Sequence, residues 1–246
     1  MPRIRLLSYN LRSLRGDTSA VVRIIRGLRP DIACLQEVPR FFGRRQKVGD
    51  LARRCGMEVA AGRRPAGLAI LTGPAVRVLH REYRLLTRVP RLHRRGVALA
   101  VVEIGDARLA VASTHLDLRD GPRLAHAGQV LSALGRLRGA YDAPAVLAGD
   151  INEPPGGPAW SLLARSLPDA YALAPAGGAA TFSSAQPRRR IDGVFADRRI
   201  RVHGCGVPAE PSRPGDYALA TDHRPVLAEL ELAGQPTWGA LQTEIN

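Results

Sequence analysis

Short apolar segments recur along most of this chain, and they constrain its fold more than any other feature. Runs of this length, rich in apolar and β-branched residues, predict β-strands, whereas apolar residues at helical spacing predict helices. The predicted strands are Ile4–Tyr9, Asp31–Gln36, Glu58–Ala61, Gly67–Leu71, Val76–Tyr83, Val97–Ile104, Arg108–Thr114, Pro144–Ala148, Ile191–Phe195, Ile200–Cys205 and Val226–Leu232. The predicted helices are Thr18–Leu28, Gln46–Cys55, Arg123–Arg138 and Pro158–Arg165.

The connections between these elements indicate the fold class. Some strands are separated by helical patterns, and Gly105-Asp106 has the sequence of a hairpin turn. Strands outnumber helices and use both kinds of connection. We therefore expect a mixed-sheet α/β fold in which two β-sheets pack together and helices lie outside.

One domain accounts for all of these elements. Among the 246 residues, 45% are hydrophobic and the composition does not change along the chain, which is ordinary for a globular protein. We expect one domain over residues 1–232 and a loose tail over residues 233–246. No apolar run approaches the ~20 residues of a membrane span. Without a recognisable signal peptide or a C-x-x-C pair, a cytoplasmic monomer with no protein partner is expected.

The chain is strongly basic, with a net charge of +14. Such a charge attracts polyanions, either nucleic acid or anionic lipid. Lys47 is the only lysine, and arginine occurs with abundant Ala, Gly and Pro. Because that combination is also typical of a GC-rich coding bias, the charge is only modest support for a polyanionic substrate.

Polar residues occur where the apolar strands end. Four segments have them at the carboxyl end: RIRLLSYN (Asn10), DIACLQE (Glu37), ARLAVASTHLD (His115, Asp117) and APAVLAGDIN (Asp150, Asn152). Two later segments have them at the start: RIDGVF (Asp192) and TDHRPVLAELEL (Asp222, His223). If the last two strands run antiparallel to the first four, all six sets meet at one edge of the fold.

The chemistry of this set is coherent. Carboxylate and amide oxygens are hard ligands that suit Mg²⁺ or Mn²⁺, and they do not suit zinc. Histidines beside carboxylates act as general bases or acids, and Asp192 beside His223 would hold one imidazole tautomer. These residues predict metal-assisted attack of water on a phosphate ester.

The motifs SYN, QE, STHLD, GDIN, RIDGVF and TDH, in this order, resemble those of the endonuclease/exonuclease/phosphatase superfamily. The resemblance extends from Ile4 to Leu232. It implies a DNase I-like four-layer sandwich, with two packed mixed β-sheets flanked by helices.

The resemblance also implies roles for individual residues. Glu37 would be the principal metal ligand, with Asn10 and Asp222 in the same metal-proximal cluster. Asp150 would orient or deprotonate the attacking water, and Asn152 would donate to a phosphate oxygen. His223, paired with Asp192, would act as the base or stabilise the pentacovalent phosphorus, and His115 would be the second histidine of the DNase-like branches.

The carboxylate partner of His115 cannot be assigned from the motifs. In DNase I the second histidine has an upstream acid, whereas GRRPAGLAILT has none. Glu58 and Glu82 are the nearest candidates to that stretch, although neither matches the family pattern, and Asp117 is another polar neighbour. The segment STHLD also lacks the tyrosine-containing pattern of the abasic-site enzymes, which favours the broader histidine-containing branches.

Basic clusters bear on the substrate. The segment His80–Gly96 is rich in arginine, and Arg95-Gly96 matches a family pattern that implies a substrate-binding Arg95. Arg188–Arg190 is a second cluster. Phosphate contacts of this kind favour a DNA nuclease. The alternatives are a phospholipid or inositol phosphate phosphodiesterase or phosphatase, for which Phe41-Phe42 would be a docking loop, and a catalytically inactive family member that binds nucleic acid.

Overall fold

The computed structural model describes residues 1–40, 44–62 and 65–232. Its first sheet has the strand order β10-β11-β1-β2-β4-β3, and its second has the order β5-β6-β7-β8-β9. The first sheet contains β1 (Arg3–Asn10), β2 (Ile32–Gln36), β3 (Glu58–Gly62), β4 (Leu68–Thr72), β10 (Ile200–Gly206) and β11 (Val226–Leu232). The second contains β5 (Arg77–Leu85), β6 (Gly96–Ile104), β7 (Ala107–His115), β8 (Ala145–Asp150) and β9 (Asp192–Ala196).

Alternating side chains along the strands bury both faces of each sheet. In β1, Leu6 belongs to the apolar cluster between the two sheets. Its neighbour Leu7 belongs to the cluster between the first sheet and the helices that cover it. Side chains in a strand point alternately to opposite faces. An apolar run without polar gaps is therefore the sequence signature of a strand buried on both sides.

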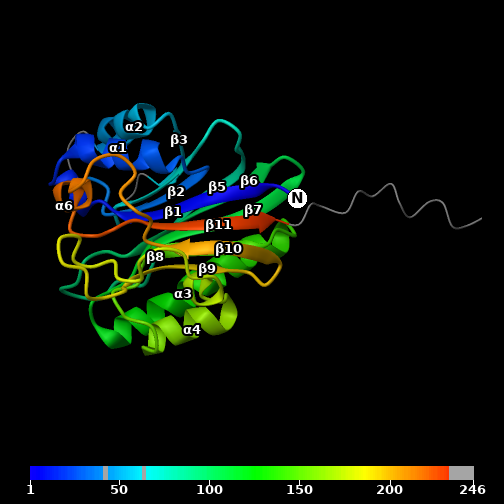
Figure 1. The fold of residues 1–246 in the computed structure, drawn as a ribbon. Coiled ribbons are helices and arrows are strands. Elements are labelled where there is room, and N and C mark those ends of the chain that lie inside the picture. Colours follow the sequence, from blue (N-terminus) through cyan, green and yellow to red (C-terminus); the bar gives the residue numbers. More distant parts are fainter. Residues whose placement is uncertain (41–43, 63–64, 233–246) are drawn as a thin grey trace, which may run out of the picture.

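Helices cover the outer faces of both sheets (Figure 1). The first sheet is covered by α1 (Thr18–Leu28) and α2 (Arg44–Arg54), whose apolar residues share a cluster with Leu35 of β2. The second is covered by α3 (Asp120–Ala140) and α4 (Pro158–Ser166), which pack on Leu147 of β8. The predicted fold class, two mixed sheets flanked by helices, is confirmed.

Local signals set the ends of α1, the helix whose predicted bounds agree with the structure. The Asp17 carboxylate accepts a hydrogen bond from the Ser19 amide at 2.7 Å, which caps the amino end. Arg29 takes a left-handed conformation with φ 45° at the carboxyl end, and Pro30 prevents the helix from continuing.

Three short elements were not predicted. They are the 3-10 helix η1 (Arg12–Leu14), α5 (Ala170–Leu173) and α6 (Asp216–Ala220). Elements of three to five residues are too short to show the spacing of an apolar helix face. The predicted tail, residues 233–246, lies outside the described residues. No helix in the described ranges has an apolar stretch that could span a membrane.

Glycines at two positions should respond in opposite ways to substitution by alanine. A Cβ on Gly149 of β8 would lie 2.1 Å from the Thr114 carbonyl oxygen of β7, whereas a Cβ on Gly128 of α3 meets no atom within 4 Å. We expect Gly149→Ala to cost more than about 2 kcal/mol of unfolding free energy. We expect Gly128→Ala to add about 0.5–1 kcal/mol. Urea denaturation of both variants tests this, and a tolerated Gly149→Ala would contradict the close strand packing.

Candidate active site

Strand direction brings the polar strand ends together. β1 runs parallel to β2 in the first sheet, and β7 runs parallel to β8 in the second. Because Asn10 at the end of β1 is hydrogen-bonded to Asp150 at the end of β8, the carboxyl ends of both pairs meet at one edge. β11 is antiparallel to β1 and β9 is antiparallel to β8, so their amino ends reach that edge too. The expected reversal of the last two strands is confirmed.

Asp150 lies at the centre of the resulting cluster. Its side chain is buried and accepts hydrogen bonds from Asn10 Nδ2 at 2.9 Å and from the Asn152 amide at 2.9 Å. The nearest histidine nitrogens are His115 Nε2 at 3.4 Å and His223 Nε2 at 3.7 Å. Burial, followed by repulsion from Asp192, raises the pKa of Asp150 to about 7. A carboxyl group with such a pKa can exchange a proton near neutral pH.

His223 is held by Asp192, as expected. The His223 Nδ1–H group donates to Asp192 Oδ2 at 2.9 Å, and the Phe182 ring lies 5.0 Å from the imidazole between ring centroids. Burial alone would lower the pKa of His223, but the Asp192 and Asp150 carboxylates raise it to about 9. His223 is therefore a protonated imidazole at neutral pH, and its Nε2 faces Asp150.

His115 has a different environment. Asn152 Nδ2 donates to His115 Nε2 at 2.9 Å, which leaves the proton on Nδ1. The nearest carboxylate oxygen to Nδ1 is Glu37 Oε1 at 3.8 Å. Burial, and then the positive charge of Arg95, lower the pKa of His115 well below its usual value. His115 is thus a neutral hydrogen-bonding group.

The carboxylates closest to His115 are therefore Glu37 and Asp150, and none of the three acids considered from the sequence takes this place. Glu58 is exposed on β3, and Glu82 pairs with Arg84 and lies 3.7 Å from His80. Asp117 accepts from the Arg119 amide at 3.0 Å. Glu37 directly follows β2, which lies in the opposite sheet from His115. An acid from the strands near His115 is therefore not required to face its imidazole.

Asp222 lies at the periphery of the cluster. Its carboxylate pairs with Arg12 Nε at 3.3 Å and accepts from the Thr221 hydroxyl at 3.3 Å. That same hydroxyl also donates to the Asn10 carbonyl oxygen at 3.0 Å. Seven of the eight predicted site residues are joined by direct contacts, and Asp222 is connected to them only through its neighbours. The seven are Asn10, Glu37, His115, Asp150, Asn152, Asp192 and His223.

Two of these residues have left-handed backbones. Glu37 has φ 48° and Asn152 has φ 57°. Non-glycine residues take this conformation at a cost of about 1–2 kcal/mol, less for asparagine, and it occurs often at functional sites. The turn directs both side chains back into the cluster after their strands end.

The cluster opens into a cavity of about 690 Å³. Positive side chains line it more than negative ones. The lining arginines and lysine are Arg15, Arg40, Lys47, Arg95 and Arg189, with His93 beside them, and the lining acids are Glu37 and Asp150. Of the basic segment His80–Gly96, only His93 and Arg95 reach this cavity.

Arg95 is buried at the cavity wall. It is 5% exposed, and its Nε lies 3.7 Å from Asp117 Oδ2, beyond hydrogen-bond distance. Burial lowers the pKa of Arg95. A buried guanidinium with an incomplete set of acceptors favours binding of an anion.

An ion pair that was not predicted fixes the loops behind the site. Buried Arg123 of α3 donates to Glu153 Oε1 at 3.0 Å and to the Asn152 carbonyl oxygen at 3.2 Å. It also donates to the Leu118 carbonyl oxygen at 2.9 Å. Glu153 Oε2 accepts from the Trp160 amide at 2.7 Å, in the first turn of α4. The sequence does contain a signal for the contact of Glu153 with α4, because an acidic residue stands a few positions before Pro158, which begins that helix.

The residues present fit a divalent metal ion. Ligand atoms of Asp150, Asp192 and His223 lie within 4.8 Å of one another, and Asp192 Oδ1 is buried without a hydrogen-bond partner. A second, overlapping set joins Glu37 and Asn10 to Asp150. Both sets are dominated by oxygen, as hard cations prefer.

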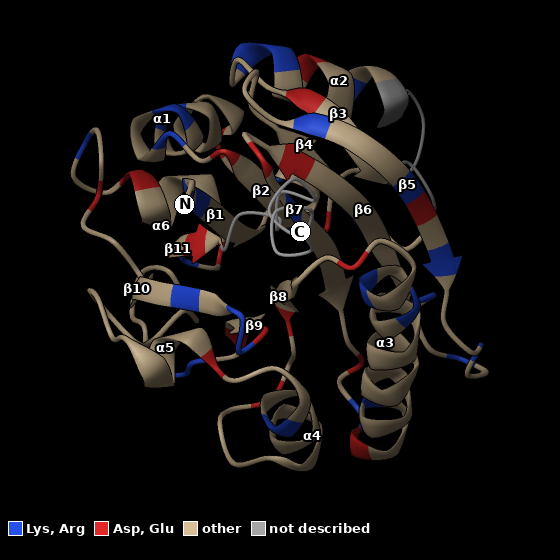
Figure 2. Cartoon of the chain, turned by 90° about the vertical axis from the view of Figure 1, so that its right-hand side faces the viewer, with Lys and Arg blue, Asp and Glu red and all other residues tan. Residues whose placement is uncertain are grey.

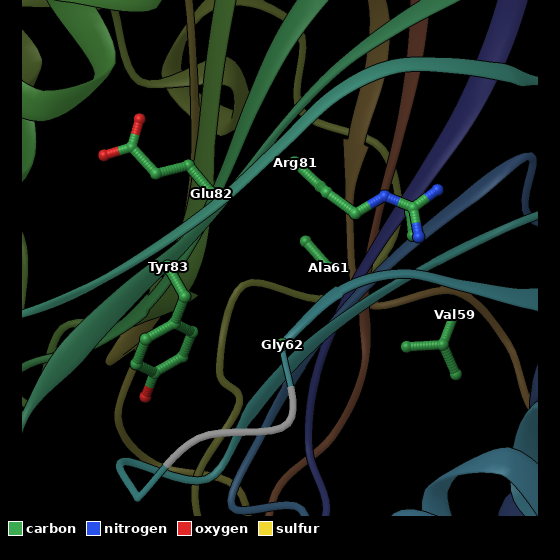
Figure 3. Close-up of a pocket in the computed structure, with 7 residues that line it drawn as sticks. Val59, Ala61, Gly62, Arg81, Glu82 and Tyr83 are labelled. Atoms are coloured by element: carbon green, nitrogen blue, oxygen red, sulfur yellow. The ribbon is translucent and has the colours of Figure 1, made fainter.

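A smaller cavity lies between the edge strands β3 and β5 (Figure 3). It measures about 240 Å³, and its lining has one acid, Glu82, and no histidine. Basic segments are spread over α1, α2, β5 and β10 (Figure 2). The 690 Å³ cavity, in contrast, combines arginines and a lysine with the cluster of acids and histidines.

Comparison with known proteins points to one family. The model of the Endonuclease/Exonuclease/phosphatase family matches residues 7–223, which contain all of the predicted site residues. No curated protein sequence matches the chain.

Solved structures share the fold at low sequence identity. An endonuclease/exonuclease/phosphatase from Bacteroides vulgatus is 21% identical with a TM-score of 0.80, covering 95% of this chain and 100% of the other. A mannosyl-6-phosphatase from Bacteroides thetaiotaomicron is 19% identical with a TM-score of 0.77, covering 93% and 100%. The human Nocturnin catalytic domain with bound sulfate is 20% identical with a TM-score of 0.75, covering 94% and 95%.

The raised pKa of Asp150 predicts a pH-dependent stability in the metal-free protein. The folded state holds this proton up to about pH 7, whereas the unfolded state releases it near pH 3.8. Stability is therefore lost as pH rises through this window, by up to about 4 kcal/mol. Asp150→Asn removes the cost of ionising a buried carboxyl group. The variant should therefore unfold at a higher temperature than the parent at pH 8, and at nearly the same temperature as the parent near pH 4.

Thermal unfolding in EDTA, followed by circular dichroism from pH 4 to pH 8, measures this difference. Asp106→Asn, in the exposed β6–β7 turn, is the matched control. Parallel curves for the parent protein and Asp150→Asn would contradict the description of Asp150 as a carboxylate buried among other charges.

Proposed function

The chain belongs to the endonuclease/exonuclease/phosphatase family, a group of phosphoesterases, and we propose that it hydrolyses phosphodiester bonds with Mg²⁺ as cofactor and DNA as substrate. The observation that carries the proposal is the buried cluster of Asp150, His115 and His223 at the floor of a cation-lined cavity. Because all of its side chains come from a single chain, we propose that the protein acts as a monomer.

The donor set suggests where Mg²⁺ binds. In the group Asp150, Asp192 and His223, the last two are hydrogen-bonded to each other, which engages one carboxylate oxygen and one ring nitrogen. Glu37 and Asp150 line the open cavity, whereas Asp192 does not. We therefore assign the cation to the second set, Glu37, Asn10 and Asp150, with Glu37 as principal ligand. When bound, it would supply positive charge to the phosphate oxygens.

The protein residues then divide the proton transfers. Asp150, which faces both histidines at the floor of the cavity, accepts a proton from the attacking water. The oxygen of that water forms the new bond to phosphorus, in line with the P–O bond that breaks, and no covalent enzyme intermediate forms. Protonated His223, oriented by Asp192, donates a hydrogen bond to the phosphate or a proton to the leaving oxygen.

His115 and Arg95 hold the phosphate. Asn152 and His115 are joined at 2.9 Å, and both line the cavity. The Nδ1–H group of His115 and the guanidinium of Arg95 would bind the non-bridging phosphate oxygens. Asn152 would orient the imidazole, because its amide donates to His115 Nε2 and to the Leu116 carbonyl oxygen. Asp222 would act indirectly, through Arg12 and the Thr221 hydroxyl.

Charge favours DNA as the substrate. The net charge is +14, and Arg15, Arg189 and Arg95 reach the cavity itself. Polyanionic strands are bound by such groups through their phosphates, without reading of sequence. The segment Phe41-Phe42, on which a lipid-docking loop would depend, lies outside the described residues.

A second candidate is hydrolysis of a smaller phosphate ester, such as a phospholipid headgroup or an inositol phosphate. The concave cavity of about 690 Å³ favours it, since cavities of roughly 300–1,000 Å³ are typical of small-molecule sites. A substrate panel separates the two. Supercoiled plasmid, sphingomyelin, phosphoinositides and a generic chromogenic phosphodiester are incubated with Mg²⁺, with EDTA as control.

We expect Mg²⁺-dependent cleavage of the plasmid, abolished by EDTA and by Glu37→Ala. Hydrolysis confined to phosphoinositides or sphingomyelin would establish the second candidate and reject DNA. A protein that cleaves no phosphate ester in the panel would contradict the proposed function as a whole.

Variants of Glu37 and Asp192 should distinguish the residue that binds the metal from the residue that orients the proton donor. Glu37→Gln should abolish the rise in unfolding temperature that Mg²⁺ produces in the parent protein. Asp192→Asn should keep that rise, but lower kcat by about 10²–10⁴-fold because His223 loses its orienting acceptor. Mg²⁺ titrations followed by differential scanning fluorimetry, together with steady-state kinetics, measure both effects.

A Mg²⁺-induced rise that survives in Glu37→Gln and disappears in Asp192→Asn would move the cation to Asp150, Asp192 and His223. Asp31→Asn, outside the cavity, is the control for loss of one carboxylate charge and should behave like the parent protein in both measurements.

A further inference from the structure

The cavity holds more positive side chains than one phosphate group needs. The scissile phosphate has Arg95, His115 and His223 available at the catalytic floor. Five further basic side chains line the same cavity: Arg15, Arg40, Lys47, His93 and Arg189. Only two acids, Glu37 and Asp150, line the cavity with them, and both belong to the catalytic cluster.

Arg40, Lys47 and His93 lie on one flank of the cavity. Arg40 and Lys47 follow β2, in the connection to α2 and in the first helical turn, and His93 precedes β6. In the sheet orders, β2 borders β4 and β6 borders β5. By contrast, His223 precedes β11, which lies on the other side of β1 from β2, and Asp192 begins β9, at the opposite end of its sheet from β5. The flank of Arg40, Lys47 and His93 is therefore opposite the His223 side of the catalytic cluster.

Lys47 is the most informative member of this flank. It is exposed, and it makes no ion pair with a carboxylate in the described part of the chain. By contrast, Arg53 of the same helix pairs with Asp50. Lys47 also lies in the first turn of α2, where the partial positive charge of the helix end adds to its own.

Arg40 is fixed in place by a glycine. Gly67 has φ +69°, and a Cβ at this position would lie 2.7 Å from Arg40 Nε. The side chain of Arg40 therefore packs closely over Gly67 at the end of the loop before β4. This close packing limits the rotamers of Arg40, and a pre-positioned guanidinium loses less entropy when it binds an anion.

We propose that Arg40, Lys47 and His93 form a subsite for a second phosphate group, next to the scissile one on the same substrate. The inference rests on the proposed phosphoesterase function and defines its substrate class more narrowly. The second phosphate could be the neighbouring backbone phosphate of a nucleic-acid strand or a second phosphate ester on a small molecule. In both cases the subsite discriminates against substrates that carry the scissile phosphate alone.

Matched substrates test the subsite. For the strand, thymidine 5′-(4-nitrophenyl phosphate) is compared with the same compound carrying a 3′-phosphate. For the small molecule, glucose 6-phosphate is compared with glucose 1,6-bisphosphate. Since a hydrogen bond to a charged group is worth roughly 10–100-fold in affinity, we expect the second phosphate to raise kcat/KM by at least about tenfold in one pair, mainly through KM.

Lys47→Met should move the ratio of the two kcat/KM values in that pair towards unity. Arg136→Met, which removes an exposed cation of α3 outside the cavity, is the matched control and should keep the ratio of the parent protein. A ratio near unity in the parent for both pairs overturns the proposal. So does a ratio that falls equally in Lys47→Met and Arg136→Met.

A binding measurement separates the subsite from the proposed function. Because Lys47 is the only lysine, reductive methylation mapped by peptide mass spectrometry reports on this single side chain. Labelling is done in EDTA with thymidine 3′,5′-bisphosphate or thymidine 5′-monophosphate, and with the two glucose phosphates. The bisphosphates should protect Lys47 at concentrations at least about tenfold lower than the monophosphates.

Equal protection by mono- and bisphosphates, or no protection at all, overturns the subsite even if the protein is an active phosphoesterase. Conversely, a protein that hydrolyses none of the four substrates, but whose Lys47 is protected selectively by a bisphosphate, keeps the subsite and contradicts the proposed hydrolysis of these esters. The two failures are therefore distinguishable.

Discussion

The hydrogen bond from Asn10 to Asp150 joins the two sheets at the point where β1 and β8 end, and the rest of the site depends on it. It spans 140 residues of sequence and measures 2.9 Å. A buried carboxylate without donors would cost several kcal/mol. Asn10 and the Asn152 amide provide those donors, and they leave Asp150 facing both histidines.

The same low-polarity environment gives two chemically similar histidines opposite states. His223 has a carboxylate partner from the adjacent strand β9 and stays protonated, whereas His115 accepts from an amide and stays neutral. A neutral hydrogen-bond donor and a protonated imidazole thus both face Asp150, the proposed proton acceptor, at one pH. Arg123 stabilises the neutral state of His115 indirectly, because it donates to the Asn152 carbonyl oxygen and so fixes the loop whose amide donates to His115.

Much of this site could be predicted from the sequence, because polar residues that end apolar strands must gather at a sheet edge. Asn10, Glu37, Asp150 and His223 follow from that rule. Contacts between side chains do not. The proximity of Glu37 to His115 crosses from one sheet to the other, and the pairing of Asp222 with Arg12 depends on a three-residue 3-10 helix. Neither feature has a periodic signal in the sequence.

The position of the cation tests the central claim most directly, namely that residues from both sheets form one metal-dependent hydrolytic centre. Anomalous diffraction from crystals soaked in Mn²⁺, collected at the manganese edge, locates the ion without an assay of activity. The account predicts one strong peak in contact with the Glu37 carboxylate and beside Asp150. A peak remote from both residues, or none at saturating Mn²⁺, would contradict it.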